Sequence, residues 1–172
     1  MGWSRDGRVP SPEHAASHCP TADRPVSARE DYDACRALLA EGSKSFDFAS
    51  RLLPSRLRDP VAAFYGFCRI SDDAVDEGGD PEAALIELRI RLDGIFSGDP
   101  ADEPVDRALA RVVCEHGLVR GPIDALLEGY AWDAKGRAIA DWDDVVGYSA
   151  RVAAGGGVVV ALIMGRGAPV TR

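Results

Sequence analysis

Residues 64–79 read FYGFCRISDDAVDEGG, and this stretch indicates both the fold class and the chemistry of the chain. Phe64, Cys68 and Val75 share one face of a helical period, because their spacings are close to multiples of 3.6 residues. The glycine pair at 78–79 favours a left-handed C-terminal cap, so we expect the helix to end there. The sequence therefore predicts a long helix whose face changes from apolar to acidic toward its C-terminus.

The last two turns of this predicted helix carry four carboxylates: Asp72, Asp73, Asp76 and Glu77. Each acid costs roughly 0.3–1 kcal/mol there, because the helix macrodipole is negative at that end. Asp72 and Asp76 also repel each other, since residues four apart share a face. A bound cation would reverse the sign of each of these effects. Mg²⁺ prefers oxygen ligands and often takes only one or two carboxylates plus phosphate oxygens. The alternative is a solvated acidic face.

Working outward from this helix, apolar residues recur at helical spacing almost throughout. No segment alternates with a period of two, so we expect an all-α fold. The expected helices are residues 31–42 with Asp31 as cap, 44–53, a helix opened by Asp59-Pro60, one opened by Asp80-Pro81, 105–117, 122–132, and one capped by Asp141. The core face of the helix after Asp80 would carry Leu85, Leu88, Leu92 and Ile95.

Composition places the chain among ordinary globular proteins and limits its partners. At 172 residues, one domain is expected, with residues 1–28 as a flexible extension and residues 29–172 as the folded part. The net charge of −8, without a basic stripe, argues against nucleic acid as the partner. Four scattered cysteines without a CxxC motif favour a reducing cytosol. The apolar run 152–165 is shorter than the about 20 residues of a spanning helix, and peripheral contact with the inner membrane stays open.

A second candidate site precedes the acidic helix. Residues 42–46 read GSKSF and place two hydroxyls and an ammonium at the start of a predicted helix. Such a helix start binds phosphate well, although Ser-x-Ser is also common capping chemistry. Arg69 could neutralise the nearby acids or bind an anion that a metal ion brings in. The glycine run at 155–157 costs about 1 kcal/mol per residue relative to alanine, so it suggests close approach by another backbone or by a bulky ligand.

Several segments together resemble the squalene and phytoene synthase family, most of all its bacterial phytoene synthases. They occur in family order over residues 34–166: SKSF at 43–46, LP at 53–54, FYGFCR at 64–69 with DDAVDE at 72–77, LEG at 127–129 with Asp133, and Tyr148 followed by RVA at 151–153 and Gly157. The resemblance implies a terpenoid-synthase-like helical bundle around a central cavity. It also implies a Mg²⁺-dependent prenyltransferase, with Mn²⁺ as an alternative ion, in carotenoid biosynthesis.

The resemblance further implies the reaction and the roles of individual residues. Two molecules of geranylgeranyl diphosphate would condense head to head through prephytoene diphosphate to give phytoene. The carried-over roles are Asp72 and Asp76 as metal ligands with Asp73 in support, Ser43, Lys44, Ser45, Tyr65 and Arg69 at the substrate diphosphate, Tyr148 near the reacting carbons, and Phe46, Phe64, Val152 and Gly157 in the cavity wall. Phe67 is expected in the core.

One departure from the family pattern defines the alternatives. The second Asp-rich motif of the family has no counterpart up to Arg172, so we expect an N-terminal portion of such an enzyme. The alternatives are a squalene-type synthase that uses farnesyl diphosphate and a non-catalytic helical family member. Residues 154–157 read AGGG where the family more often has Ala-Gly-x-Val-Gly.

Overall fold

The computed structural model describes residues 25–77 and 79–165, and every secondary-structure element in these ranges is helical. In chain order the elements are α1 (Pro25–Gly42), α2 (Lys44–Arg51), α3 (Ser55–Glu77), α4 (Pro81–Ser97), α5 (Pro104–His116), α6 (Gly121–Ala134), α7 (Trp142–Ser149), the π-helical turn η2 (Ala150–Ala154) and α8 (Gly155–Gly165). The all-α prediction is confirmed.

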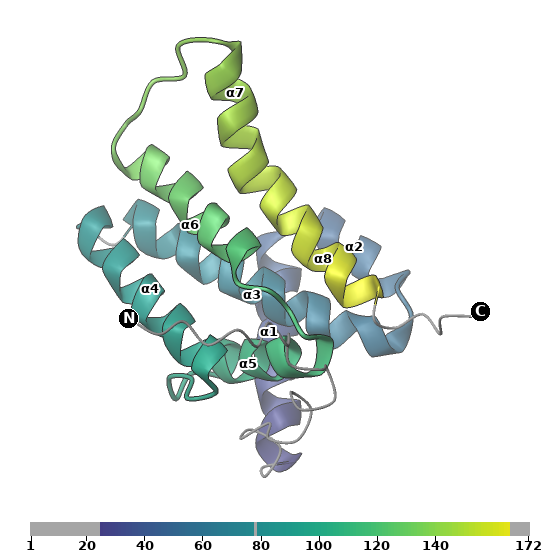
Figure 1. The fold of residues 1–172 in the computed structure, drawn as a ribbon. Coiled ribbons are helices and arrows are strands. Elements are labelled where there is room, and N and C mark those ends of the chain that lie inside the picture. The colour runs from purple at the N-terminus through teal and green to yellow at the C-terminus, as the bar shows by residue number, and fades with distance from the viewer. Residues whose placement is uncertain (1–24, 78, 166–172) are drawn as a thin grey trace, which may run out of the picture.

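Helix α3 is the centre of the bundle, since α1, α2, α4, α5, α6 and α8 all contact it. Its Ala62, Ala63 and Phe67 have no measurable exposure. Helix α6 lies beside η2 and α8, and Figure 1 shows α7 and α8 following one another along a single line. Helix α3, which carries the acidic residues at its C-terminal end, is therefore packed by helices along its length.

The helix boundaries follow local capping chemistry at the predicted positions. The Asp80 carboxylate accepts from the backbone N–H groups of Glu82 and Ala83, both at 3.1 Å, and Asp141 accepts from the N–H of Asp144 at 2.9 Å. Helix α3 ends at Glu77, and Gly79 follows with a φ of +77°. The four predicted core residues of α4, Leu85, Leu88, Leu92 and Ile95, are all buried. These parts of the prediction are confirmed.

Two helix starts differ from the prediction. Helix α1 begins at Pro25, so residues 25–28 of the expected extension are helical, and residues 1–24 lie outside the described part of the chain. Helix α3 begins at Ser55, and Pro60 lies inside it rather than at its first turn. The extra turn is held by Leu57, which is 3% exposed and whose N–H donates to the carbonyl of Pro54 at 2.9 Å.

Asp31 is not the predicted helix cap, because it lies within α1 and is only 1% exposed. Its carboxylate pairs with Arg107 at 2.6 Å and with Arg111 at 2.8 Å, both on α5. A second buried carboxylate, Asp106 of α5, accepts two hydrogen bonds from Arg91 of α4, at 2.7 and 2.9 Å. Buried charges need such partners, so these ion pairs fix how α1, α4 and α5 pack beside α3.

Close packing against α6 explains one glycine of the run at 155–157, Gly155. A Cβ at this position would lie 2.8 Å from the carbonyl oxygen of Pro122 on α6, closer than real Cβ atoms approach an oxygen. The close approach to another backbone, one of the two explanations expected from the sequence, is therefore present at Gly155. Nothing lies within 4 Å of a Cβ built at Gly157.

Gly155→Ala is expected to destabilise the fold by about 1–3 kcal/mol, because the methyl group collides with a backbone carbonyl that cannot rotate away. Gly157→Ala is the matched control, and there the better helix propensity of alanine should stabilise by up to about 1 kcal/mol. Urea unfolding of both variants measures the difference. Equal effects at the two positions would show that the α6–α8 contact is not tight.

Helices α7 and α8 form a longer apolar helix than the sequence run suggested. Residues Trp142–Gly165 make 24 continuous helical residues whose length and composition would suffice to cross a membrane, and 17% of the apolar 18-residue stretch within this helix is buried. The prediction of a run too short to span a membrane considered the apolar residues 152–165 alone. It did not include the continuation of the helix through α7. Trp142, Val146, Val158 and Met164 are exposed along this helix.

Candidate functional site

Near the C-terminal end of α3, Asp73 is paired with an arginine, whereas Asp72 and Asp76, within the part of the chain that the structure describes, are not. Arg69 forms an ion pair with Asp73 at 2.8 Å, one turn away on the same helix. Asp72 and Asp76 form no ion pair with any arginine or lysine of the described residues. Burial raises the pKa of Asp72 above its ordinary value, and the charges of Asp76 and Asp73 raise it further. Burial and the neighbouring acids thus disfavour the charged form of Asp72, one of the two carboxylates predicted to hold a metal ion.

The raised pKa of Asp72 predicts how stability depends on pH. The folded chain binds more protons than the unfolded chain between the ordinary pKa of 3.8 and the raised one, so stability should fall as pH rises through this window. Asp72→Asn removes this contribution and should flatten the fall. Urea unfolding from about pH 4 to about pH 7 measures it. Identical slopes for the two proteins would contradict the raised pKa.

Tyr148 of α7 is held by Asp133, the penultimate residue of α6. Its hydroxyl donates to Asp133 Oδ2 at 2.9 Å. Burial raises the pKa of Tyr148, the hydrogen bond to Asp133 raises it further, and the charges of Asp72 and Asp76 act in the same direction. The structure therefore brings Tyr148 into the electrostatic field of the α3 acids. Sequence reasoning placed Asp133 in a motif but assigned it no role.

The predicted diphosphate-binding residues converge from α2 and α3. A Cβ at Gly42 would lie 2.6 Å from Tyr65 Oη and 3.4 Å from Arg69 Cδ, so both side chains lie against the last residue of α1, directly before the Ser43 cap of α2. The Ser43 hydroxyl accepts from the N–H of Phe46 at 3.3 Å, which is the capping role. Ser45 and Lys44 are exposed. Phosphate contact by this group stays a prediction.

The four residues predicted for the cavity wall do not share one environment. Phe64 is 5% exposed and packs in the core, as Phe67 does, with its ring edge 3.9 Å from a Cβ built at Gly156. Val152 is half-buried, and its Cγ2 lies 2.5 Å from a Cβ built at Gly129. Phe46 is 63% exposed, although its ring lies edge-on to Tyr65 with centroids 6.0 Å apart. Gly157 is also exposed.

The donor chemistry of the acidic end fits a hard divalent cation in part. Asp72 and Asp76 supply oxygen ligands, the type that Mg²⁺ and Mn²⁺ prefer. Among residues 25–77 and 79–165, no group of three or more His, Cys, Asp or Glu side chains is arranged to hold a metal ion. The pair therefore fits a site in which water and substrate oxygens complete the coordination, and does not form a closed protein cage.

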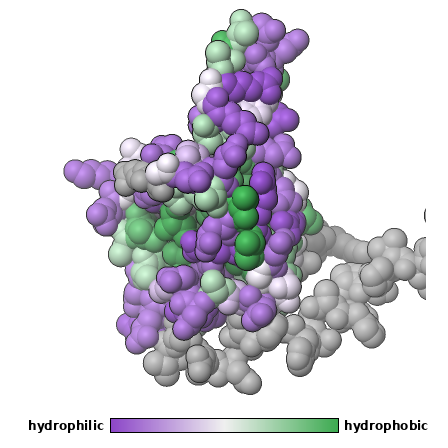
Figure 2. All heavy atoms as spheres, turned by 90° about the vertical axis from the view of Figure 1, so that its left-hand side faces the viewer, coloured by the Kyte–Doolittle hydropathy of each residue, from purple (hydrophilic) through white to green (hydrophobic). Residues whose placement is uncertain are grey.

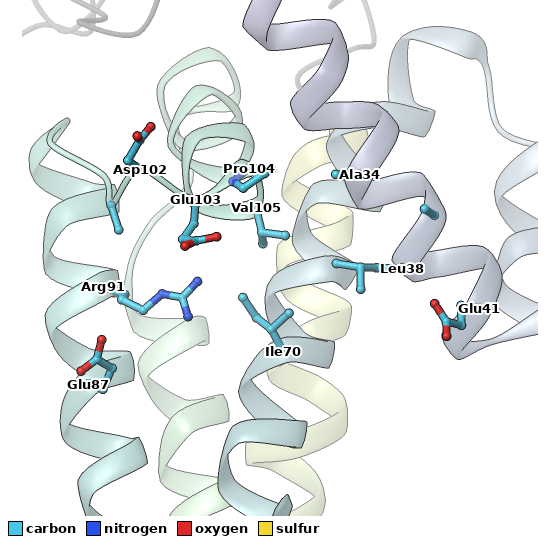
Figure 3. A pocket seen from close by; sticks show the side chains of 12 residues that line it. Ala34, Leu38, Glu41, Ile70, Glu87, Arg91, Asp102, Glu103, Pro104 and Val105 are labelled. Atoms are coloured by element: carbon cyan, nitrogen blue, oxygen red, sulfur yellow. The ribbon is translucent and has the colours of Figure 1, made fainter. Parts of the chain in front are cut away.

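A hollow of about 730 Å³ lies elsewhere, between α1, α3, α4 and the start of α5. Its apolar floor includes Leu38, Ile70 and Val105, and Figure 3 shows the acids Glu87 and Glu103 around it. None of the site residues predicted from the sequence lines it.

Helix α4 also carries exposed apolar side chains. Ile86 is 58% and Ile90 62% exposed. Figure 2, which views the side of the molecule where α4 lies, shows apolar surface set among hydrophilic surface.

Comparisons with known proteins identify relatives of this chain. The family model described as squalene/phytoene synthase matches residues 39–172. A phytoene synthase from Rhodobacter capsulatus is 49% identical over 140 residues, which cover 80% of this chain and 41% of that protein. A 15-cis-phytoene synthase from a Paracoccus species is 37% identical, covering 74% of this chain and 45% of that protein. The chain thus spans less than half the length of these relatives.

Two solved structures have the same fold over most of this chain. A dehydrosqualene synthase in complex with a ligand superposes with a TM-score of 0.74 at 30% identity, over 79% of this chain and 48% of that one. A squalene synthase from Alicyclobacillus acidocaldarius superposes with a TM-score of 0.77 at 31% identity, over 84% of this chain and 55% of that one.

Proposed function

Because the chain belongs to the squalene/phytoene synthase family, we propose that it acts in the head-to-head condensation of two geranylgeranyl diphosphates to phytoene. Residues 29–172 would supply the part of the enzyme that carries the first acidic motif. The proposal draws on the names of the relatives in Rhodobacter capsulatus and Paracoccus, both phytoene synthases. Its setting would be carotenoid biosynthesis in the cytosol, with peripheral contact at the inner membrane.

The observation that carries the proposal is the unneutralised pair Asp72 and Asp76 at the end of a buried helix. Holding two like charges together without a cation is unfavourable, and Arg69 is already paired with Asp73. Mg²⁺ bound by Asp72 and Asp76 would stabilise the charge of a departing diphosphate. The ammonium of Lys44 and the hydroxyls of Ser43 and Ser45 would bind the same diphosphate from the α2 side.

The chain's own residues would orient the substrate and exclude water. Tyr65 and Arg69 lie against the turn at Gly42, between the α2 hydroxyls and the α3 acids, and would bind diphosphate oxygens there. Tyr148 faces the acids from α7 and would lie near the reacting carbons. The aromatic rings of Phe46 and Tyr65 would shield an allylic cation from water and stabilise it through their π faces.

The proposed reaction proceeds in two ionisations. In the first, the C–O bond to diphosphate breaks in one substrate, and the allylic carbon joins the double bond of the other with loss of a proton to give prephytoene diphosphate. In the second, the remaining diphosphate leaves and rearrangement with proton loss gives phytoene. Two diphosphates leave in all, which is why a site rich in cationic and hydrogen-bonding groups suits the reaction.

The experiment that tests the proposed function compares substrate chain lengths. The protein is incubated with Mg²⁺ and labelled geranylgeranyl diphosphate or labelled farnesyl diphosphate, and the hydrocarbon products are separated. We expect phytoene from the C20 substrate and little product from the C15 substrate. Predominant turnover of farnesyl diphosphate would overturn the assignment and favour a squalene-type synthase, the activity named for the two solved structures.

A non-catalytic helical role is the second candidate, and the exposed apolar residues of α7 and α8 favour it. Trp142 is 75% exposed, Val146 51% and Val158 46%, so this surface could bind another protein. Analytical ultracentrifugation, together with the turnover assay above, distinguishes the two candidate functions. Magnesium-dependent turnover by a monomer would exclude the non-catalytic role, whereas stable self-association without turnover would favour it.

A further inference from the structure

We propose that Asp133 is a positioning residue that fixes the hydroxyl of Tyr148 at the edge of the acidic site. The two residues lie on different elements, Asp133 at the end of α6 and Tyr148 within α7, and the connecting loop lies between them. Their hydrogen bond of 2.9 Å closes that loop. The role of the Tyr148 hydroxyl in the reaction rests on the proposed function. The contact between Asp133 and Tyr148 does not, and it can be tested separately.

The ring of Tyr148 is already constrained by its neighbour Trp132. The two ring centroids are 6.3 Å apart. The guanidinium carbons of Arg137 and Arg151 lie 3.7 and 4.9 Å from the Trp132 ring, in cation–π contact. Arg151 is in turn anchored by Glu128 at 3.2 Å and by the carbonyl of Gly147 at 2.8 Å. Trp132 is therefore well held, and it limits the rotation of the Tyr148 ring.

Close packing of α6 against η2 makes the hydrogen bond geometrically accessible. A Cβ at Gly129 would lie 2.5 Å from Val152 Cγ2 and 3.4 Å from Arg151 Cβ, so only glycine permits this approach. Gly129 lies one turn before Asp133 on α6, and η2 begins two residues after Tyr148. The contact brings the end of α6 within reach of the Tyr148 hydroxyl.

Asp133 accepts a hydrogen bond from the Tyr148 hydroxyl, and this bond favours the protonated form of the tyrosine. The hydrogen bond fixes the direction of the hydroxyl, and the charges of Asp72 and Asp76 also act on Tyr148. While the hydroxyl donates to Asp133, its oxygen can still accept a hydrogen bond. Without Asp133, we expect the hydroxyl to turn and lose its fixed direction.

Fluorine NMR of the 172-residue chain tests the contact directly. All four tyrosines are replaced by 3-fluorotyrosine, and Tyr148→Phe identifies the Tyr148 signal by its loss. We expect Asp133→Asn to shift or broaden the Tyr148 signal and leave the signals of Tyr32 and Tyr65 in place, whereas Tyr130, on which the charge of Asp133 also acts, is not used as a reference.

Asp124→Asn, which removes a partner of Arg120 at the other end of the same helix, is the matched control and should leave the Tyr148 signal within its width. An unchanged Tyr148 signal in Asp133→Asn would overturn the proposal.

A double-mutant cycle on the affinity for geranylgeranyl diphosphate in the presence of Mg²⁺ tests the positioning role, because Tyr148 is proposed to lie near the reacting carbons. Asp133→Asn and Tyr148→Phe should each weaken binding by about threefold to tenfold, and the double variant should be no weaker than either single variant. Fully additive losses would show that Asp133 does not act through Tyr148. If the unaltered chain does not bind geranylgeranyl diphosphate, the proposed function fails, whereas the fluorine signal still decides whether Asp133 positions Tyr148.

Discussion

Asp72→Asn and Asp76→Asn are each expected to lower the affinity of the chain for a divalent cation by more than about a hundredfold. Outer-shell partners of metal ligands typically contribute about 10–100-fold, so loss of a direct ligand should cost more. The two carboxylates lie one turn apart on α3 and have no cationic side chain as partner among the described residues. Mn²⁺ titration in the presence of pyrophosphate, followed by the electron paramagnetic resonance signal of the free ion, measures the affinity.

Stability separates a ligand role of these acids from a structural one. Removing either charge relieves repulsion at the negative end of the helix, so the unfolding temperature should stay the same or rise slightly. Glu87 lines the hollow between α1, α3, α4 and the start of α5, which none of the predicted site residues lines. Glu87→Gln is therefore the control, and it should change neither the affinity for the cation nor the stability. A sharp fall in the unfolding temperature of Asp72→Asn would show that the acids are structural.

Asp31→Asn is expected to destabilise the fold by about 3–5 kcal/mol, because it leaves a buried arginine without its counter-charge. Arg111 is 6% exposed, and its Nε and Nη1 already lack hydrogen-bond partners, so the ion pair with Asp31 at 2.8 Å is its main compensation. Urea unfolding at neutral pH measures the loss.

Asp102→Asn is the matched control for Asp31→Asn. Asp102 pairs with Arg107 at 2.6 Å, as Asp31 does, but its side chain is 97% exposed. An exposed ion pair contributes little, about 0–1 kcal/mol. Similar losses for the two variants would contradict the view that the buried Asp31 network fixes how α1 packs on α5.

Local chemistry made most of the fold predictable. The Asp80 and Asp141 caps, the glycine stop after α3 and the buried face of α4 depend on residues within one or two turns of each other. The start of α1 and the role of Asp31 were not predictable in this way. Asp31 is held by Arg107, 76 residues away, and a single sequence carries no signal for that pairing.

In the candidate site, too, the features set by local sequence were predictable and those set by packing between helices were not. The shared face of Asp72 and Asp76 and the proximity of Arg69 follow from helical spacing on α3. The approach of Tyr65 to Gly42 depends on how α1 packs on α3, and that of Tyr148 to Asp133 depends on how α6 packs beside α7 and η2. The glycines at 42, 129 and 155 were the available signal, because each permits an approach that a Cβ would block.

Calorimetric titration of the chain with pyrophosphate, with and without Mg²⁺, tests the central claim most directly. If Asp72 and Asp76 serve to hold a cation against a diphosphate, pyrophosphate should bind only when Mg²⁺ is present, and Asp72→Asn should abolish that binding. Equal binding in Mg²⁺ and in excess chelator, or Mg²⁺-dependent binding that survives the loss of both carboxylates, would contradict the account.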